Sequence, residues 1–208
     1  MGCLRQVEPP ADLVIVPQFC VRFNDIDNVG ITMSHHTGFI MIGQLAFVPE
    51  EKWNQDKYFS DLMSWFTDGL GIPKEEITLH EDAWAGGGNF GPCMEFFCRG
   101  LELANQVYML FEQTPEGDKP LKLKVLDMGM GHERNAWFVQ GEGTTYDSAF
   151  PTVMEKLFDK TGVKYDKEFV KRYLPYAGFL NLDEVDDIDA SWKDVASKVG
   201  TSVEELRE

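Results

Sequence analysis

Apolar and polar residues alternate along several stretches of the chain with the two-residue period of β-strands. Leu13 to Phe23 is rich in valine, isoleucine and phenylalanine, and Thr37 to Phe47 places successive side chains on opposite faces. The polar stretch between them, Asn24 to His36, contains Gly30 and predicts a long loop, so we expect an antiparallel hairpin. Further strands are predicted at Glu76 to His80, Met94 to Arg99, Leu101 to Gln113 and Leu121 to Asp127.

Other stretches have the spacing of helices. Between Glu51 and Leu70 the apolar residues fall on one stripe, which Gly69 to Pro73 ends. Ser202 and Glu205 have the spacing of a capping box. The remaining predicted helices are Gly131 to Gln140, Pro151 to Lys160, Ser191 to Val199 and Thr201 to Arg207. Together the pattern predicts an α+β fold, an antiparallel sheet flanked by helices.

Glycines and charged residues mark the predicted loops and linker. Trp84 to Pro92 contains four glycines and is predicted to be a loop, and Thr114 to Pro120 an exposed turn. Asn181 to Asp189 holds five acidic residues in nine positions, which is typical of a solvated linker. We therefore expect one folded region in residues 1–180, followed by an acidic linker and short helices in residues 181–208.

The composition is that of a globular protein with a strong excess of acids. The 208 residues include 35 Asp and Glu against 19 Lys and Arg, which gives a formal net charge of −16. A nucleic-acid-binding protein normally carries a basic face, and an anionic membrane repels an acidic protein. The charge therefore argues against a surface that tracks phosphates along a nucleic acid and against binding to a membrane surface.

Segments that would direct the chain to a membrane are not found in the sequence. No run of about 18 apolar residues occurs, and no apolar signal-peptide core precedes Pro9. The cysteines have no C-x-x-C spacing, which favours reduced thiols over a disulfide framework or a zinc site. We therefore expect a cytoplasmic protein with no membrane partner. The cysteines are Cys3, Cys20, Cys93 and Cys98.

The candidate chemistry is concentrated between Asp127 and Arg134, where a predicted strand ends, glycines follow and a helix begins. Gly129 and Gly131 would let the backbone approach a ligand closely. The planar, permanently charged fork of Arg134 suits a polyphosphate, and Asp127 suits an ammonium group. By spacing alone, a glycine-capped turn with a surface arginine explains the segment equally well.

Three further features are weaker indications. The run Gly86 to Gly91 lacks the Lys-Ser/Thr pair of a P-loop, but Trp84 beside it is suited to line a small-molecule pocket. His35 and His36 would point to opposite faces of a strand, so structural roles are favoured over a metal site. Arg22 lies close to acidic residues, and a surface ion pair is its simplest interpretation.

Four motifs, in order, resemble those of the alanyl-tRNA synthetases, a class II family, in their archaeal form. Cys20 to Phe39, with R-F-N-D-I-D-N-V-G and H-H-T-G-F, resembles motif 2. Trp84 to Glu95 resembles the amino-acid pocket loop, and Asn105 to Met109 the pocket strand that follows. Asp127 to Arg134 is similar to motif 3, written G-x-G-L-E-R, with His132 in place of the leucine. The resemblance extends over roughly residues 13–200.

The resemblance implies the class II fold and the activity of a ligase. Such an enzyme activates alanine with ATP to an aminoacyl-adenylate and releases pyrophosphate. By position, Arg22 would neutralise the α-phosphate and the amino acid's carboxylate, Phe39 would stack on adenine, and Arg134 would bind the γ-phosphate. Gly131 would complete the ATP site, and Mg²⁺ would shield the phosphates with Glu95 as a ligand.

The resemblance also implies a pocket for a small amino acid. Asp127 would hold the α-ammonium group, and the residues around a methyl side chain would be Trp84, Asn105, Val107 and Gly129. Serine and glycine are expected to compete with alanine, because one methyl group distinguishes substrates by only about 1–3 kcal/mol. The acceptor of the activated amino acid is left open between tRNA, a tRNA mimic and a carrier-protein thiol.

No segment similar to motif 1 precedes motif 2 in the sequence, and regions similar to the family's tRNA-recognition, editing and dimerisation domains are not found. We therefore expect a truncated or free-standing relative. Three hypotheses are compatible with this: an amino-acid-activating enzyme, a catalytically inactive synthetase-derived binding or regulatory module, and a partial subunit. The sheet of the partial subunit would be completed by a partner chain or by self-association.

Overall fold

The computed structural model describes residues 10–141, 143–182 and 185–207, so Cys3 and part of the acidic stretch lie outside it. The strands are β1 (Leu13–Val21), β2 (Gly38–Val48), β3 (Ile77–Gly86), β4 (Asn89–Cys98), β5 (Leu101–Thr114) and β6 (Gly117–Gly131). The α-helices are α1 (Gln55–Ser64), α2 (His132–Gln140), α3 (Thr145–Ala149), α4 (Pro151–Thr161), α5 (Lys167–Tyr173), α6 (Ile188–Val199) and α7 (Val203–Arg207).

The strands form one six-stranded sheet in the order β1-β2-β6-β5-β4-β3. The pairs β2–β6, β6–β5, β5–β4 and β4–β3 are all antiparallel. At the predicted hairpin, the Arg22 N–H donates to the Thr37 carbonyl and the Phe47 N–H to the Asp12 carbonyl, each at 2.9 Å. The predicted fold class, an antiparallel sheet flanked by helices, is therefore confirmed. None of the helices described here is long and apolar enough to cross a membrane.

The chain divides into two compact units. The described residues of unit 1 are 10–18 and 41–131, and those of unit 2 are 19–40 and 132–207. Unit 1 therefore holds most of the sheet with α1, and unit 2 holds the polar loop before β2 together with the helices from α2 onward. The sequence-based division at residue 180 stays a prediction.

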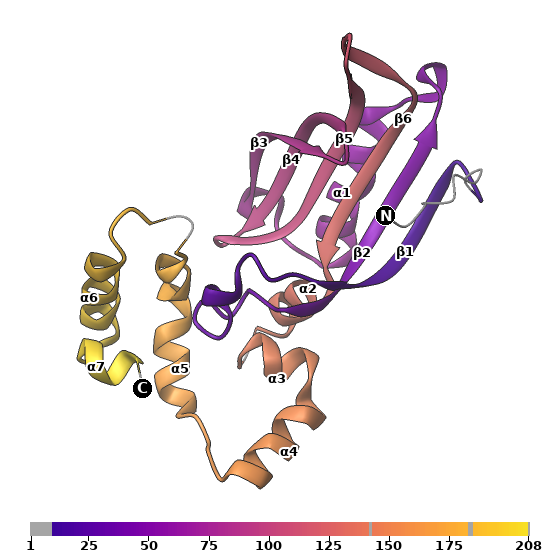
Figure 1. Ribbon diagram of the computed structural model, residues 1–208. Helices are drawn as coiled ribbons and strands as arrows, with labels where there is room; N and C mark the ends of the chain where they lie inside the picture. The colour runs from indigo at the N-terminus through magenta and orange to yellow at the C-terminus, as the bar shows by residue number, and fades with distance from the viewer. Residues whose placement is uncertain (1–9, 142, 183–184, 208) are drawn as a thin grey trace. The chain divides into compact units, whose positions relative to one another are not determined.

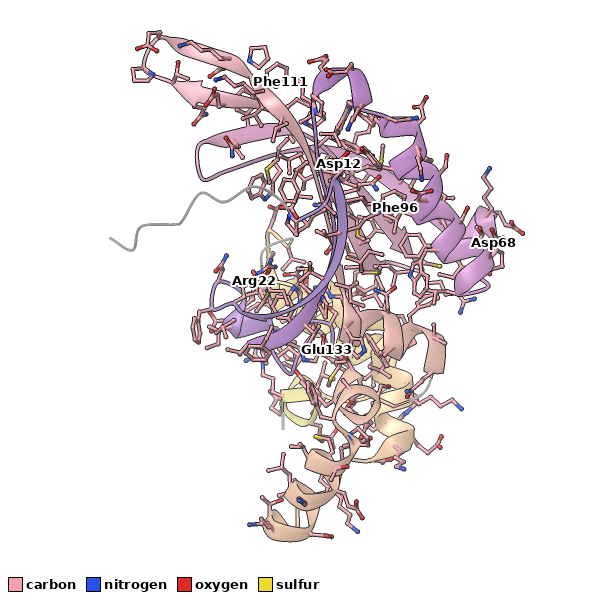
Figure 2. All side chains as sticks on the ribbon, turned by 90° about the vertical axis from the view of Figure 1, so that its right-hand side faces the viewer. Asp12, Arg22, Asp68, Phe96, Phe111 and Glu133 are labelled. Carbon is pink, nitrogen blue, oxygen red and sulfur yellow. The ribbon has the colours of Figure 1, made fainter. Side chains whose placement is uncertain are left out.

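In unit 1, α1 covers one face of the sheet. It lies behind the strands in Figure 1. The buried Gln106 side chain on β5 donates to the Tyr58 carbonyl of α1 at 3.0 Å and accepts from the Tyr108 hydroxyl at 2.6 Å. Phe96 lies between the sheet and α1, with the Phe59 and Phe66 rings each 5.6 Å from it (Figure 2). Burial of these aromatic rings and pairing of the buried Gln106 amide fix the helix on this face.

The prediction of a loop from Trp84 to Pro92 is wrong. β3 continues to Gly86 and β4 begins at Asn89, so only two residues form the turn between them. Gly87 and Gly88 have φ of +61° and +87°, the combination that a type I′ hairpin turn requires and that glycine adopts without strain. Glycines here therefore make a tight hairpin instead of a loop.

The strand that leads to motif 3 is also longer than predicted. β6 extends to Gly131, so Asp127 and Gly129 lie inside the strand and not at a turn after it. The helix α2 then begins at His132 without an intervening loop. Pairing with β2 sustains the strand, since Gly129 lies opposite Gly43 and Gly131 opposite Met41.

In unit 2, the segment α5–α6 forms a small helical core. Its buried residues are Tyr173, Ala177, Leu180, Val195 and Val199. Figure 1 shows α6 beside α5. The predicted capping box of the last helix is confirmed: the Ser202 hydroxyl accepts from the Glu205 N–H at 3.1 Å, and the Glu205 carboxylate accepts from the Ser202 N–H at 3.2 Å. The short helices α3 and α5 were not predicted.

Candidate functional site

The register of unit 1 brings the predicted amino-acid-binding residues onto one face of the sheet, opposite α1. Residues that face each other in neighbouring strands point to the same side. We call the first set of facing residues the Glu95 row and the second the Asp127 row. In the order β3, β4, β5, β6, β2, the Glu95 row is His80, Glu95, Asn105, Gly129, Gly43, and the Asp127 row is Asp82, Cys93, Val107, Asp127, Leu45.

Trp84 shares this face, because on β3 it lies two residues after Asp82 and four residues after His80. Its indole ring lies over Gly86: a Cβ built on that glycine would be 2.3 Å from the ring. The glycine next to the turn therefore provides room for a large aromatic side chain that remains 38% exposed. The predicted role of Trp84 in a pocket stays a prediction.

Asn105 has one end of its amide bound and the other unpaired. Its Nδ2 donates to Glu95 Oε1 at 3.5 Å, a long and weak hydrogen bond. Burial raises the pKa of the Cys93 thiol, and a hydrogen bond from Asn105 partly opposes that rise. Asn105 Oδ1 is buried and has no hydrogen-bond partner among the described residues. A buried acceptor left unpaired in this way is a position where a donor from a ligand would be stabilised.

Asp127 lies in the neighbouring row and also lacks a partner. Burial raises the pKa of its carboxyl group, and no hydrogen bond or ion pair to this carboxylate occurs within the described residues. A half-buried carboxylate without a counter-ion favours an incoming cation. The carboxylate of Asp127 and the amide oxygen of Asn105 are thus two unpaired acceptors in adjacent rows of one face.

Beside the two acceptors, the same face of the sheet carries glycines, which have no side chain. Gly43 and Gly129 face each other on β2 and β6. The Met41 side chain lies over Gly129, where a Cβ would come within 2.8 Å of its sulfur. Sequence reasoning did not single out Met41, although the alternation of Thr37 to Phe47 places it on the same face as Gly43.

In unit 2, Arg22 and Phe39 lie together where β1 ends and β2 begins. The Arg22 guanidinium is 5.6 Å from the centre of the Phe39 ring, within the range of a cation–π contact. The predicted surface ion pair is present as well, between Arg22 and Asp25 at 3.8 Å. The Arg22 side chain is 50% exposed, so this pair contributes little to stability and leaves the guanidinium accessible. Figure 2 labels Arg22.

Arg134 lies in the first turn of α2, beside a buried acid that fixes that turn. The carboxylate of Glu133, labelled in Figure 2, accepts the Ile40 N–H at 3.0 and 3.2 Å from its two oxygens. Arg134 Nε donates to the Ser34 carbonyl at 2.9 Å. Glu133 thereby fixes the start of α2 to the residue that follows Phe39. Sequence reasoning missed Glu133, and its only signal was the E-R pair of motif 3.

The two histidines lie at the end of the predicted loop, just before β2, and anchor it there. His35 Nδ1 is 2.6 Å from the Thr32 hydroxyl, and His36 Nε2 is 3.1 Å from the Thr145 hydroxyl. Burial lowers the pKa of His36, which favours its neutral form. The part of the chain that the structure describes contains no cluster of three or more His, Cys, Asp or Glu side chains arranged as metal ligands.

Comparison with known proteins identifies the group to which these motifs belong. The family model described as tRNA synthetases class II (A) matches residues 3–208. The chain belongs to the class II tRNA synthetase family. The alanine–tRNA ligase of Methanocella arvoryzae is 52% identical over 206 residues, which cover 98% of this chain and 24% of the relative. That of Methanothermobacter thermautotrophicus is 42% identical over 206 residues, which cover 96% and 22%.

These comparisons confirm the resemblance drawn from the four motifs. The chain spans about a quarter of the length of the curated relatives it matches. A solved pyrrolysyl-tRNA synthetase of Desulfitobacterium hafniense aligns with a TM-score of 0.45 and 19% identity, and covers 66% of this chain and 45% of that one.

Within this class II synthetase chain, Glu95 fits poorly as a magnesium ligand. His80 Nδ1 lies 2.8 Å from Glu95 Oε2, and the Asn105 amide occupies Oε1. The hydrogen bond to Glu95 raises the pKa of His80. Both carboxylate oxygens of Glu95 already have partners in the row, and among the described residues Glu95 belongs to no cluster of three possible metal ligands, so no catalytic step is assigned to a metal at Glu95. Mg²⁺ usually keeps several waters and binds through one or two carboxylates and the substrate's phosphates.

Proposed function

We propose that the chain binds ATP and alanine, or a similarly small amino acid, and joins them into an aminoacyl-adenylate. The observation that carries this proposal is the pair of unpaired acceptors, Asn105 Oδ1 and the Asp127 carboxylate, side by side in one face of the sheet. An α-ammonium group has three N–H donors and one positive charge. Its donors can bind both oxygens, and its charge can offset that of the Asp127 carboxylate. Val107 lies opposite Asp127 and offers an apolar contact to a methyl side chain.

The nucleotide is assigned to residues by their positions in motifs 2 and 3. Phe39 would stack on adenine, Arg22 would neutralise the α-phosphate and the amino acid's carboxylate, and Arg134 would bind the γ-phosphate. Gly131 would permit close approach of backbone to the nucleotide. Magnesium, when bound, would offset the charge of the phosphates.

The chemistry is a displacement at phosphorus. A carboxylate oxygen of alanine attacks the α-phosphorus, the bond to the bridging oxygen of pyrophosphate breaks, and pyrophosphate carries the electron pair away. No protein group has to take up a proton in this step, so the protein contributes by positioning the two substrates and neutralising charge. Transfer to tRNA or another acceptor would follow, as the names of the relatives indicate for those proteins.

ATP–pyrophosphate exchange with a panel of amino acids tests this proposal. We expect alanine-dependent exchange, with serine and glycine activated more weakly by about 10- to 200-fold. Arg22→Ala and Arg134→Ala should each reduce exchange by about a hundredfold or more, because each removes a charge that offsets the developing charge on the phosphates. Arg99→Ala is the matched control, since it removes an exposed guanidinium paired with Glu76.

Other outcomes separate the alternatives. Binding of alanine or ATP without exchange would favour the inactive binding module. Exchange that requires a second chain would favour the partial subunit. Exchange that survives both arginine substitutions would contradict the proposed nucleotide contacts.

A further inference from the structure

The Glu95 carboxylate lies between two side chains of its own row. His80 on β3 is 2.8 Å from one oxygen, and Asn105 on β5 donates to the other at 3.5 Å. All three residues face one another directly across neighbouring strands, so the register of the sheet sets their separation. The Glu95 side chain is 21% exposed and that of His80 is 62% exposed. The row therefore runs from solvent at β3 toward the buried amide on β5.

The two ends of an asparagine amide are chemically opposite, because NH₂ only donates and the carbonyl oxygen only accepts. The Glu95 carboxylate on β4 receives the NH₂ end of the Asn105 amide, and a hydrogen bond from Asn105 also lowers the pKa of the Cys93 thiol on the same strand. The amide oxygen is consequently directed away from these groups, and it is the end that is buried without a partner. If β4 offered no acceptor, the two orientations of the Asn105 amide would be equivalent in this network.

We propose that Glu95 is a positioning residue for the amino acid: it holds the Asn105 amide so that Oδ1, and not the NH₂ group, faces the substrate's ammonium. The inference rests on the proposed function, in which that ammonium lies between Asn105 and Asp127. If the amide were flipped, its NH₂ group would face the N–H donors of the ammonium. Of the two proposed acceptors, only the Asp127 carboxylate would then remain. His80 restrains the other oxygen of Glu95 and so keeps the carboxylate in the row.

The kinetic test is a double-mutant cycle in alanine-dependent exchange. Glu95→Ala is expected to raise KM for alanine about tenfold, with kcat and KM for ATP changed by less than about twofold. Asn105→Ala should raise the same KM, and adding Glu95→Ala to it should cost nothing more, because Glu95 acts through Asn105. Glu81→Ala is the matched control, since Glu81 lies opposite Met94 and points to the other face.

Independent effects that multiply in the double variant would overturn the inference. So would an altered magnesium dependence in Glu95→Ala, which would instead support a metal-binding role.

A second measurement does not depend on catalysis. The side-chain NH₂ signals of Asn105 in a ¹H–¹⁵N spectrum of the full chain are assigned by their loss in Asn105→Ala. Glu95→Ala should shift them, and Glu81→Ala should not. Alanine titrated into the unmodified chain should move signals of this row, with about tenfold weaker affinity in Glu95→Ala.

Unchanged Asn105 signals in Glu95→Ala, or alanine affinity that is insensitive to this substitution, would overturn the inference whether or not the chain is active. If the unmodified chain binds alanine with this dependence but catalyses no exchange, the proposed activation fails and the role of Glu95 in binding stands.

Discussion

Asp127 is a residue whose proposed role opposes its contribution to stability. Its carboxyl is half-buried without a partner, and burial raises its pKa above the usual range of an aspartate. The folded state therefore favours the protonated form, so stability falls as the pH rises from the usual aspartate pKa to the raised one, and the full cost of ionising Asp127 is present at every pH above it. The cost is absent at pH values below the pKa of the unfolded chain, where both states are protonated.

Asp127→Asn is therefore expected to stabilise the ligand-free chain while it weakens alanine binding. At neutral pH we expect the thermal midpoint to rise by about 2 °C, and KM for alanine to rise about a hundredfold, because a buried charge pair is lost. The gain in midpoint should shrink as the pH falls through the raised pKa. Asp82→Asn, in the same row at the sheet edge, is the control. A lower midpoint for Asp127→Asn would contradict this account.

Single residues also show what the sequence could supply. The motifs were sufficient to single out Asp127 and Asn105, and alternation along each strand gave its two faces. The relation of Glu95 to His80 depends on the β3–β4 register, which a two-residue turn sets and which sequence reasoning had taken for a loop. Without that register, the only role that the sequence suggested for Glu95 was the magnesium ligand implied by the resemblance.

At the scale of elements, the β3–β4 hairpin depends on glycines with different functions. Gly87 and Gly88 supply positive φ in the turn, in open space. Gly91 lies where the register of β4 and β5 shifts, and a Cβ built there would be only 1.9 Å from the Tyr108 carbonyl oxygen. Backbone cannot move aside as a flexible side chain can, so this contact requires glycine.

Gly91→Ala is expected to destabilise unit 1 far more than a substitution in the turn. We expect a loss of about 3 kcal/mol of unfolding free energy, because β4 must separate from β5 to admit the methyl group. Gly88→Ala should cost only about 1 kcal/mol, the strain of positive φ in open space. Urea denaturation of both variants measures the difference. Equal losses would show that the strands do not approach as closely as described.

The loop before β2 is held by elements far along the chain. The Asn28 side chain is 1% exposed; it donates to Asn181 Oδ1 at 3.0 Å and accepts the Leu182 N–H at 2.9 Å. Tyr146 of α3 accepts the Gly30 N–H at 3.0 Å and donates to the His35 carbonyl at 3.3 Å. Side chains of unit 2 therefore supply the hydrogen bonds that neighbouring strands would make to an extended segment. Arg22 lies at the start of the loop that they hold.

Asn28→Ala should lower the stability of unit 2 by about 2–3 kcal/mol, because it leaves a buried amide and a buried N–H without their partner. Asp27→Ala, which removes the exposed side chain next to it, should change stability by less than about 0.5 kcal/mol. Thermal unfolding of both variants tests the difference. If the two changes are equivalent, the contact with Asn181 does not hold the loop.

The helices of unit 2 were predicted unevenly for a physical reason. α4 begins with a proline and α6 carries a clear apolar stripe, so local signals were strong. α5 has only seven residues and is fixed by its Asp166 cap and by Tyr173, whose hydroxyl donates to the Ile31 carbonyl. Contacts 142 positions apart in the chain stabilise this short helix, and no local pattern encodes them.

For the molecule as a whole, the two edges of the sheet have opposite character. β3 exposes His80, Glu81 and Asp82, and such charged side chains protect an edge strand from pairing with another chain. On β1, alternate residues are apolar and exposed, with Ile15 and Phe19 each 71% accessible. An exposed apolar edge strand is a template for association, while the net charge of −16 opposes it.

We therefore expect the chain to self-associate through β1, and more strongly as salt is added, because screening weakens the repulsion between copies while leaving the apolar contact intact. Ile15→Lys should reduce the association constant by about tenfold or more, since a buried lysine would lose hydration without gaining a partner. Leu79→Lys makes the same change of charge at the 42% exposed Leu79 of β3 and should have little effect. Sedimentation velocity at two salt concentrations measures all three proteins. Equal effects of the two lysines would assign association to net charge alone, and a chain that is monomeric at both salt concentrations would remove β1 as an interface.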